Sequence, residues 1–98
     1  MFARVTEIEI IKDEIDEAIR VYKEEVIPLR HLRKGSRGGY LLVDRETGKS
    51  IAITFWESRE YQGNSDEESQ YVVKQKIFKS HLSSDRVDLG LYEVCTEG

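Results

Sequence analysis

The stretch RGGYLLVDRETGKSIAITFWES, residues 37–58, decides the fold because it predicts two β-strands joined by a tight turn. Its two halves, residues 40–44 and 50–58, are rich in aliphatic, β-branched and aromatic residues, and Gly48 between them favours a hairpin turn. Neither strand alternates cleanly between apolar and polar residues, since each contains a run of three apolar residues. Strands of this kind are typical of a sheet that is covered on both faces. The hairpin therefore raises the question of what covers its second face.

The segments outside the hairpin predict a strand and a helix on each side of it. Residues 2–11 alternate and are rich in β-branched side chains, which favours a strand. From Asp13, which can cap a helix, apolar residues recur with helical spacing, and Pro28 is expected to kink this helix or end its regular part. A second helix is expected over residues 67–82 and a last strand over residues 86–95. This order predicts an α+β, ferredoxin-like βαββαβ fold, a four-stranded antiparallel sheet with two helices on one face.

The strand patterns also predict which residues face the helices. In the third strand Ile51, Ile53 and Phe55 share one face, and this aliphatic set is expected to pack against the helices. The opposite, bare face is then expected to carry aromatic, small and hydroxyl-bearing residues: Thr6, Ala52, Thr54, Trp56, Gly90 and Tyr92. An exposed face of this composition favours a homodimer that pairs sheet face with sheet face. A small-molecule pocket is expected either between the two sheets or between the sheet and the helices.

The composition predicts a single domain spanning residues 1–98, with a small core that a partner chain would help to complete. The formal net charge of −4 and the pI of about 5.2 argue against nucleic acid as a partner. The one cysteine, Cys95, excludes an internal disulfide and fits a reducing cytosol. No apolar run approaches the roughly 20 residues of a membrane helix, and no signal peptide is recognisable. We therefore expect a cytoplasmic protein without membrane or nucleic-acid partners.

The segments FARVTEIEI, residues 2–10, and EEVIPLRHLRKGSRGGYLLVDRETGKSIAITFWES, residues 24–58, resemble the antibiotic biosynthesis monooxygenase family. The resemblance extends over nearly the whole chain and is closest in the second segment. It implies a dimeric α/β barrel and the activities of that family, which include cofactor-independent oxidation of aromatic polyketides, quinol oxidation and heme degradation. The predicted function is therefore that of a small monooxygenase acting on a planar aromatic, a quinol or heme. The alternatives are a non-enzymatic ligand-binding or stress-related dimer, and a purely structural dimer with a filled interface.

The same resemblance implies candidate site residues. Trp56 matches the tryptophan that closes this strand in the polyketide enzymes, whereas Ala52 stands where those enzymes have an asparagine. In the heme-degrading branch, IFKSH (residues 77–81) resembles the segment with the proximal histidine, which makes His81 the candidate ligand. Catalytic roles are therefore expected for His81 and Trp56. Substrate binding is expected from residues that carry hydroxyl groups: Thr6, Thr54, Tyr61, Tyr71 and Tyr92.

The sequence contains no metal-binding motif, so no metal is expected unless His81 binds the iron of heme. No cofactor is expected either, and heme enters only as a substrate. The two catalytic candidates also have structural interpretations, because His81 suits a helix C-terminus and Trp56 suits a core or dimer interface. The basic run from Arg30 to Arg37 could hold an acidic ligand or a heme propionate, but the simpler interpretation is a solvated end of the first helix.

Overall fold

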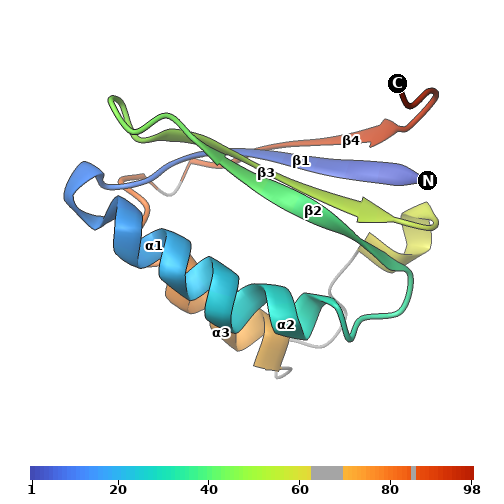
Figure 1. Ribbon diagram of the computed structural model, residues 1–98, viewed down its shortest axis with the longest axis horizontal. Helices are drawn as coiled ribbons and strands as arrows, with labels where there is room; N and C mark the ends of the chain where they lie inside the picture. Colours follow the sequence, from blue (N-terminus) through green and yellow to red (C-terminus); the bar gives the residue numbers. More distant parts are fainter. Residues whose placement is uncertain (63–69, 85) are drawn as a thin grey trace.

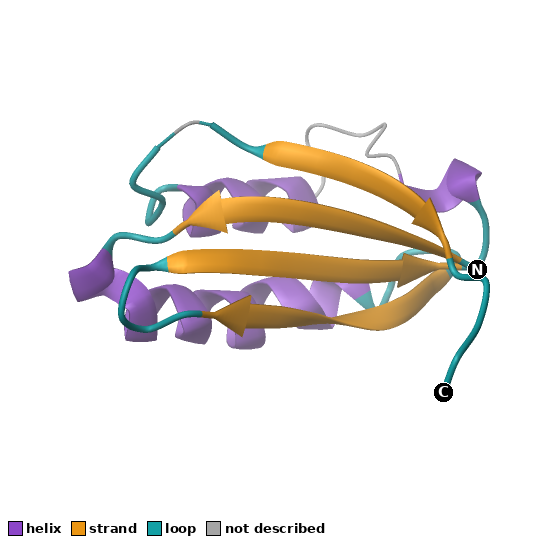
Figure 2. Ribbon diagram, turned by 90° about the horizontal axis from the view of Figure 1, so that it is seen from above, coloured by secondary structure: helices purple, strands orange, loops and turns teal. Residues whose placement is uncertain are grey.

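The chain folds into a four-stranded antiparallel sheet with its helices on one face, which confirms the predicted ferredoxin-like class. The computed structural model describes residues 1–62, 70–84 and 86–98. The elements in chain order are β1 (Phe2–Glu9), η1 (Lys12–Glu14), α1 (Ile15–Val21), η2 (Tyr22–Val26), α2 (Ile27–Arg30), β2 (Ser36–Val43), β3 (Lys49–Trp56), η3 (Arg59–Gln62), α3 (Gln70–Lys79) and β4 (Asp88–Glu93). The strands are ordered β2-β3-β1-β4. Figure 1 shows the sheet as one layer and the helices α1 to α3 as a second layer, and Figure 2 shows that none of these helices covers the other face of the sheet.

Several predicted boundaries need correction, and β1 and β3 each end two residues earlier than expected. β2 begins at Ser36, earlier than expected, whereas β4 is shorter than the predicted strand over residues 86–95. α3 covers most of the second predicted helix, and its expected first residues, 67–69, lie outside the described residues. The predicted cap at Asp13 is wrong, because this residue lies in the 3-10 turn η1, and no side-chain bond caps η1 or α1.

The first helix runs through three segments, and its middle segment is a π-helix. The backbone N–H of Ile27 donates to the carbonyl of Tyr22, five residues earlier, as in a π-helical turn. In a regular α-helix the ring of Pro28 would clash with the carbonyl four residues before it. The wide turn in front of Pro28 avoids this conflict, so the chain continues as a helix to Arg30.

Two glycines set the geometry of the hairpin. Gly48 adopts a φ of 83° in the turn, and a side chain there would meet the carbonyl oxygen of Ile10 at 2.3 Å. At Gly39 a side chain would lie 2.1 Å from the carbonyl oxygen of Ile53. The pairing of β2 with β3 shifts register between Ser36 and Gly39, as expected of a β-bulge. The glycines therefore fix which residues of β3 share a face with which residues of β2.

The predicted orientation is wrong for β1 and β3, where the helices cover the opposite face. It is confirmed for β4, where Gly90 and Tyr92 lie on the face that the helices leave bare. Thr6 pairs with Ala52 and Arg4 with Thr54, and these four side chains line a cavity against the helices. We call this side the inner face; its other members on β1 and β3 are Phe2, Ile8, Ser50 and Trp56. The outer face carries Val5, Tyr40, Leu42, Ile51, Ile53, Phe55 and Tyr92. Alternation along a strand separates two sets of residues but does not say which set meets the helices, and the more aliphatic set lies outside.

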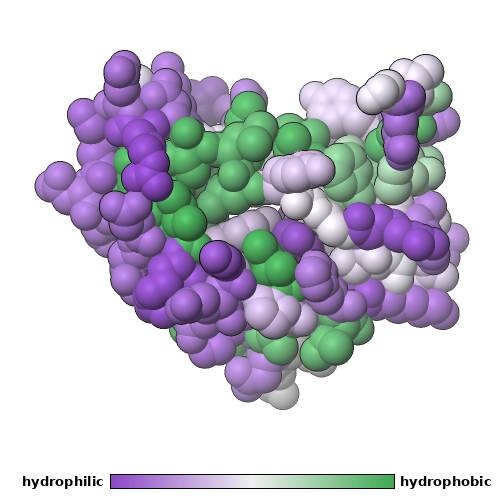
Figure 3. Space-filling view, in the orientation of Figure 1, coloured by the Kyte–Doolittle hydropathy of each residue, from purple (hydrophilic) through white to green (hydrophobic). Residues whose placement is uncertain are grey.

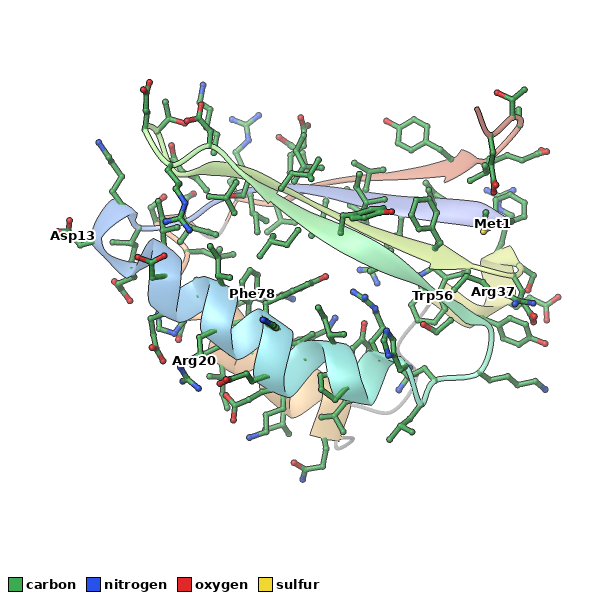
Figure 4. The ribbon with its side chains drawn as sticks, in the orientation of Figure 1. Met1, Asp13, Arg20, Arg37, Trp56 and Phe78 are labelled. Carbon is green, nitrogen blue, oxygen red and sulfur yellow. The ribbon has the colours of Figure 1, made fainter. Side chains whose placement is uncertain are left out.

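The core lies where the first helix and α3 meet the ends of β1. Its buried members include Ile10, which is 1% exposed, and Ala18, which is fully buried. Figure 4 shows Phe78 in the layer between α3 and the sheet, while Arg20 extends from the opposite side of the first helix. Within residues 1–62, 70–84 and 86–98, no helix has both the length and the apolar character that crossing a membrane requires.

Candidate functional site

A cavity of about 130 Å³ lies between the inner face of the sheet and the helices. The sheet contributes Arg4, Thr6, Ala52 and Thr54. The small side chains of Thr6, Ala52 and Thr54 leave the space that the helices do not fill. Figure 3 shows a hollow between the sheet layer and the helix layer, below hydrophobic residues of the sheet. The helices contribute Tyr22 from η2, and Tyr71 and Phe78 from α3. An engineered apolar cavity of about 150 Å³ takes up benzene, so the space here has the size of one aromatic ring.

Aromatic rings and hydroxyl groups dominate the helix side of the cavity. The rings of Tyr22 and Phe78 lie 5.1 Å apart at an angle of 58°. Burial raises the pKa of the Tyr22 and Tyr71 hydroxyls above the usual value for tyrosine, and nearby arginines offset part of this effect. Both tyrosines therefore keep their protons at neutral pH and can donate hydrogen bonds.

A buried arginine, Arg30, forms a hydrogen bond with the hydroxyl of Tyr22. Arg30 is 1% exposed, and its Nη1 donates to the hydroxyl oxygen of Tyr22 at 2.8 Å. The guanidinium also lies 5.8 Å from the centroid of the Tyr22 ring, within range of a cation–π interaction. Its Nε is buried without a hydrogen-bond partner, and no carboxylate of the described residues is seen to pair with it. The expectation of a solvated basic segment is therefore wrong for Arg30.

The charge on the cavity wall differs in sign from that of the whole chain. Arg4 and Lys79 line the cavity, and neither aspartate nor glutamate is among the described residues that line it. The chain as a whole carries a formal net charge of −4. The cavity thus combines an aromatic wall with positive charge and with hydroxyl donors, which suits a planar ligand that carries an acidic oxygen.

The structure brings together three of the predicted site residues. Thr6, Thr54 and Tyr71 line the cavity from β1, β3 and α3 respectively. Trp56 lies next to this group but not in the lining: it is 2% exposed, and its Nε1 donates to Thr54 Oγ1 at 2.9 Å. In Figure 4 Trp56 lies at the end of β3 near α2. Its indole N–H is already bonded, so its visible role is to orient the Thr54 hydroxyl.

The other predicted residues lie outside the cavity lining. His81 follows α3 and its Nδ1 lies 2.8 Å from Glu14 Oε1, while its carbonyl accepts from the N–H of Ile11. Tyr92 is 60% exposed on the outer face. Tyr61 packs against Gly35 and lines a separate outer cleft of about 450 Å³. Tyr71 lines both this cleft and the cavity, so its side chain separates the two spaces.

Tyr22, Arg30 and Arg4 were missed as site residues. Tyr22 has the helical spacing of the apolar residues of the first helix, and Arg30 belongs to the basic run at its end. The signal for Arg30 is spacing, because Tyr22, Val26 and Arg30 recur every four residues and all three are buried. Arg4 could have been recognised only from its position on the same strand face as Thr6, which is weaker evidence for a site residue.

Another hollow, of about 830 Å³, is open and lies around the ends of the sheet strands beside the β2–β3 turn. Its lining mixes carboxylates such as Glu7 and Asp88 with the cations Lys49 and Arg86. Such a charged, open depression lacks the apolar enclosure of a small-molecule site. The smaller cavity, which is less open, is therefore the candidate functional site.

Comparison with known proteins supports the fold. No family model matches the chain, and no curated protein matches it in sequence. Among solved structures, a protein of Nitrosomonas europaea placed among the antibiotic biosynthesis monooxygenases superposes with a TM-score of 0.79 at 8% identity, over 98% of this chain and 100% of that one. The monooxygenase ActVA-Orf6 of Streptomyces coelicolor, solved with nanaomycin D, gives a TM-score of 0.78 at 10% identity, over 98% and 88% of the two chains. A variant of SnoaB, a cofactor-independent oxygenase from Streptomyces nogalater, gives 0.71 at 11% identity, over 98% and 94%.

These similarities extend over nearly the full length of both chains, so they concern the whole domain and not one motif. At this level of identity they establish the fold and leave the activity open. The resemblance seen in the sequence is confirmed to this extent: the chain has the fold of the antibiotic biosynthesis monooxygenases.

Proposed function

We propose that the protein is a small cytoplasmic monooxygenase that oxidises a planar aromatic or quinol in the cavity between sheet and helices, without a cofactor. The observation that carries this proposal is the partly enclosed, one-ring-sized cavity with tyrosine and threonine hydroxyls on its walls. The similarity in fold to a cofactor-independent oxygenase and to a monooxygenase solved with nanaomycin D supports it. The substrate itself would supply the electrons that reduce oxygen.

The chemistry requires an electron-rich substrate anion. Such an anion transfers an electron to O₂, and a bond then forms between a ring carbon and one oxygen atom. A proton from solvent converts the resulting peroxide anion into a hydroperoxide. This hydroperoxide loses water, which takes the hydrogen of the same ring carbon and the outer oxygen, and a carbonyl group remains. One oxygen atom therefore enters the product and the other leaves as water. The protein would orient the ring, keep bulk water out and stabilise the anion through hydrogen-bond donors such as Tyr22 and Tyr71.

Heme is the weakest of the three predicted substrates. A porphyrin is far larger than a cavity with room for one ring. His81, the expected iron ligand, is bonded through Nδ1 to Glu14 and does not line the cavity. The described residues therefore do not fit heme, and we derive no step through it.

The proposal includes a homodimer formed through the outer face. Tyr40, Leu42 and Tyr92 on this face are between 49% and 63% exposed, although they are large and apolar or aromatic. Ile51, Ile53 and Phe55 continue the same surface on β3. Covering such a face removes a large apolar area from water, and a second copy of the chain offers a matching surface.

The direct test is oxygen uptake by purified, chelator-treated protein with a panel of substituted hydroquinones and single-ring phenols. Wild-type protein is expected to consume oxygen in proportion to product formed. Ala52→Leu should abolish this uptake, because a larger side chain would fill the cavity. Val73→Leu adds the same kind of bulk on the exposed side of α3 and serves as the control. Uptake that survives in Ala52→Leu would place the reaction elsewhere.

A non-enzymatic ligand-binding dimer is the second candidate, and one observation favours it. The described residues that line the cavity include neither histidine nor a carboxylate, so no general base is evident. Saturable binding of the aromatic panel without oxygen uptake by any member would support this candidate over the oxygenase.

A further inference from the structure

The buried guanidinium of Arg30, which has no carboxylate partner among the described residues, needs a physical explanation. Burying an arginine without a carboxylate costs several kcal/mol, because the charge loses its hydration. One bond to a neutral hydroxyl and one contact with a ring offset only part of this cost. Buried polar groups left without partners are uncommon in folded proteins and often mark a functional position. Arg30 Nε is such a group.

Tyr22 connects this charge to the cavity. Its hydroxyl oxygen accepts the hydrogen bond from Arg30 Nη1, and its ring lines the cavity. A hydroxyl that accepts from a cation becomes a stronger donor through its own proton. That proton is available for a ligand, since no hydrogen bond donated by Tyr22 is found within the described residues.

The remaining charges of the wall have the same sign. Arg4 reaches the cavity from β1 and Lys79 from α3, while the described lining contains no acidic residue. Arg33 lies outside, with its guanidinium 5.1 Å from the centroid of the Tyr71 ring. A neutral ligand gains little from this arrangement, whereas an anion gains a charge-assisted hydrogen bond and a favourable potential.

We propose that Tyr22, backed by Arg30, makes one end of the cavity an anion-binding site whose ligand is a single-ring phenol or enol bound as its anion. The ring would lie beside Phe78, and its charged oxygen would accept from the Tyr22 hydroxyl. Arg30 is then a positioning residue, because it acts through Tyr22. The positive charge of the cavity wall also explains why no general base is needed, because a ligand that enters as an anion has already lost its proton. This proposal names the substrate class of the proposed oxygenase and rests on it only in using the same cavity.

The test uses two probes of the same shape under anaerobic conditions: 4-nitrophenol, whose ionised form absorbs visible light, and the neutral 4-nitrotoluene. Wild-type protein is expected to bind the ionised phenol about tenfold more tightly than 4-nitrotoluene, because a hydrogen bond to a charged group contributes this much or more. The pKa of the bound phenol, measured by its absorbance, should fall below that of the free compound. Tyr22→Phe should weaken phenolate binding by about tenfold or more and reverse the shift in that pKa, while 4-nitrotoluene binding stays unchanged.

Arg30→Lys and Arg30→Met separate charge from packing. The lysine variant should retain part of the preference for the ionised probe, and the methionine variant should lose it. Tyr40→Phe makes the same hydroxyl deletion on the outer face, where Tyr40 is 63% exposed, and should bind both probes as wild type does. If Arg30→Met fails to fold, Tyr22→Phe still decides the question because it keeps the ring and its contact with Phe78.

Equal binding of the two probes by wild-type protein, or no saturable binding of the phenolate, would overturn the proposal. An equal loss of both probes in Tyr22→Phe would do the same, since it would show a purely structural role. The assay excludes oxygen, so a failure of the oxygenase proposal leaves this result intact. Conversely, if the protein consumed oxygen with a neutral substrate and bound anions no more tightly than neutral probes, the anion site would be rejected and the oxygenase proposal would remain.

Discussion

The two faces of the sheet reverse the usual division between core and surface. The inner face, which the helices cover, carries Arg4, Thr6 and Thr54 and encloses a cavity. The outer face, which no described helix covers, carries isoleucines, leucine and aromatic rings. A face built only for stability would show the opposite arrangement, with the aliphatic set against the helices. This arrangement is what the proposed ligand in the cavity and the proposed second copy on the outer face would require.

The two sides of the sheet also differ in the feature that lowers the stability of the isolated chain. Behind the inner face, on α2, Arg30 is buried with its Nε lacking a hydrogen-bond partner and its Nη1 bonded to Tyr22. On the outer face the cost is exposed apolar surface, as at Leu42, which is 49% exposed. Under the two proposals, an anion bound to Tyr22 would offset part of the first cost, and a second copy of the chain would remove the second. Four substitutions or conditions can break or sharpen this comparison.

The largest effect is expected from a charge on the outer face. Ile53→Asp should raise the dissociation constant of the dimer by about hundredfold or more, because each of two symmetric copies loses about 1.5–3 kcal/mol of apolar burial and gains a desolvated carboxylate. Sedimentation equilibrium over a range of concentrations measures this change. Val73→Asp puts the same charge on the exposed side of α3 and should leave the dimer intact. An unaltered dimer in Ile53→Asp would refute the outer face as the interface.

The next effect concerns the bulge that fixes which residues face inward. Gly39→Ala should destabilise the fold by about 3 kcal/mol, because the new methyl group would meet the backbone oxygen of Ile53 and force the strands apart. Gly90→Ala is the matched change, since its methyl group would meet only the flexible, exposed side chain of Tyr92. Urea denaturation of both variants compares the two costs. Equal costs would show that the close approach at Gly39 does not constrain the register.

A smaller effect is expected from the hydroxyl that joins the cavity to Trp56. Thr54→Val should cost about 2 kcal/mol, because it leaves the indole N–H of a 2%-exposed tryptophan without an acceptor. Thr6→Val removes a hydroxyl from the same face and should cost less, since it leaves no indole without an acceptor. Thermal unfolding of both variants gives the comparison. A loss at Thr6 as large as that at Thr54 would mean that the bond to Trp56 contributes little.

The smallest effect is a dependence of stability on alkaline pH. Burial raises the pKa of Tyr22 and Tyr71 above 10.0, the value in an unfolded chain. Below the unfolded pKa both states are protonated and stability is constant; above it, the unfolded chain loses protons first, so the free energy of unfolding falls as pH rises. Urea denaturation from neutral pH to above pH 10 should show a shallower decline in Tyr22→Phe than in wild type. Identical declines would mean that Tyr22 ionises in the folded protein as easily as in the unfolded chain.

Much of the fold could be predicted because its signals are local. Gly48 marks the turn of the hairpin, and the spacing of apolar residues marks the helices, so the order of elements followed from neighbouring residues alone. Three of the proposed substrate-binding residues, Thr6, Thr54 and Tyr71, also meet in one cavity. Their roles stay predictions, as do those of Trp56 and His81, until binding or turnover is measured.

The sequence by itself determined the order of strands and helices, the turn and the two alternating sets of side chains, since these depend on residues close together in the chain. Only the tertiary structure decided which set faces the helices, because strand alternation is the same for either side of a sheet. It also decided that Arg30 is buried, since a charged residue at a helix end is exposed or enclosed according to what packs above it. Both decisions depend on contacts between segments far apart in the chain, and the candidate site is made of such contacts.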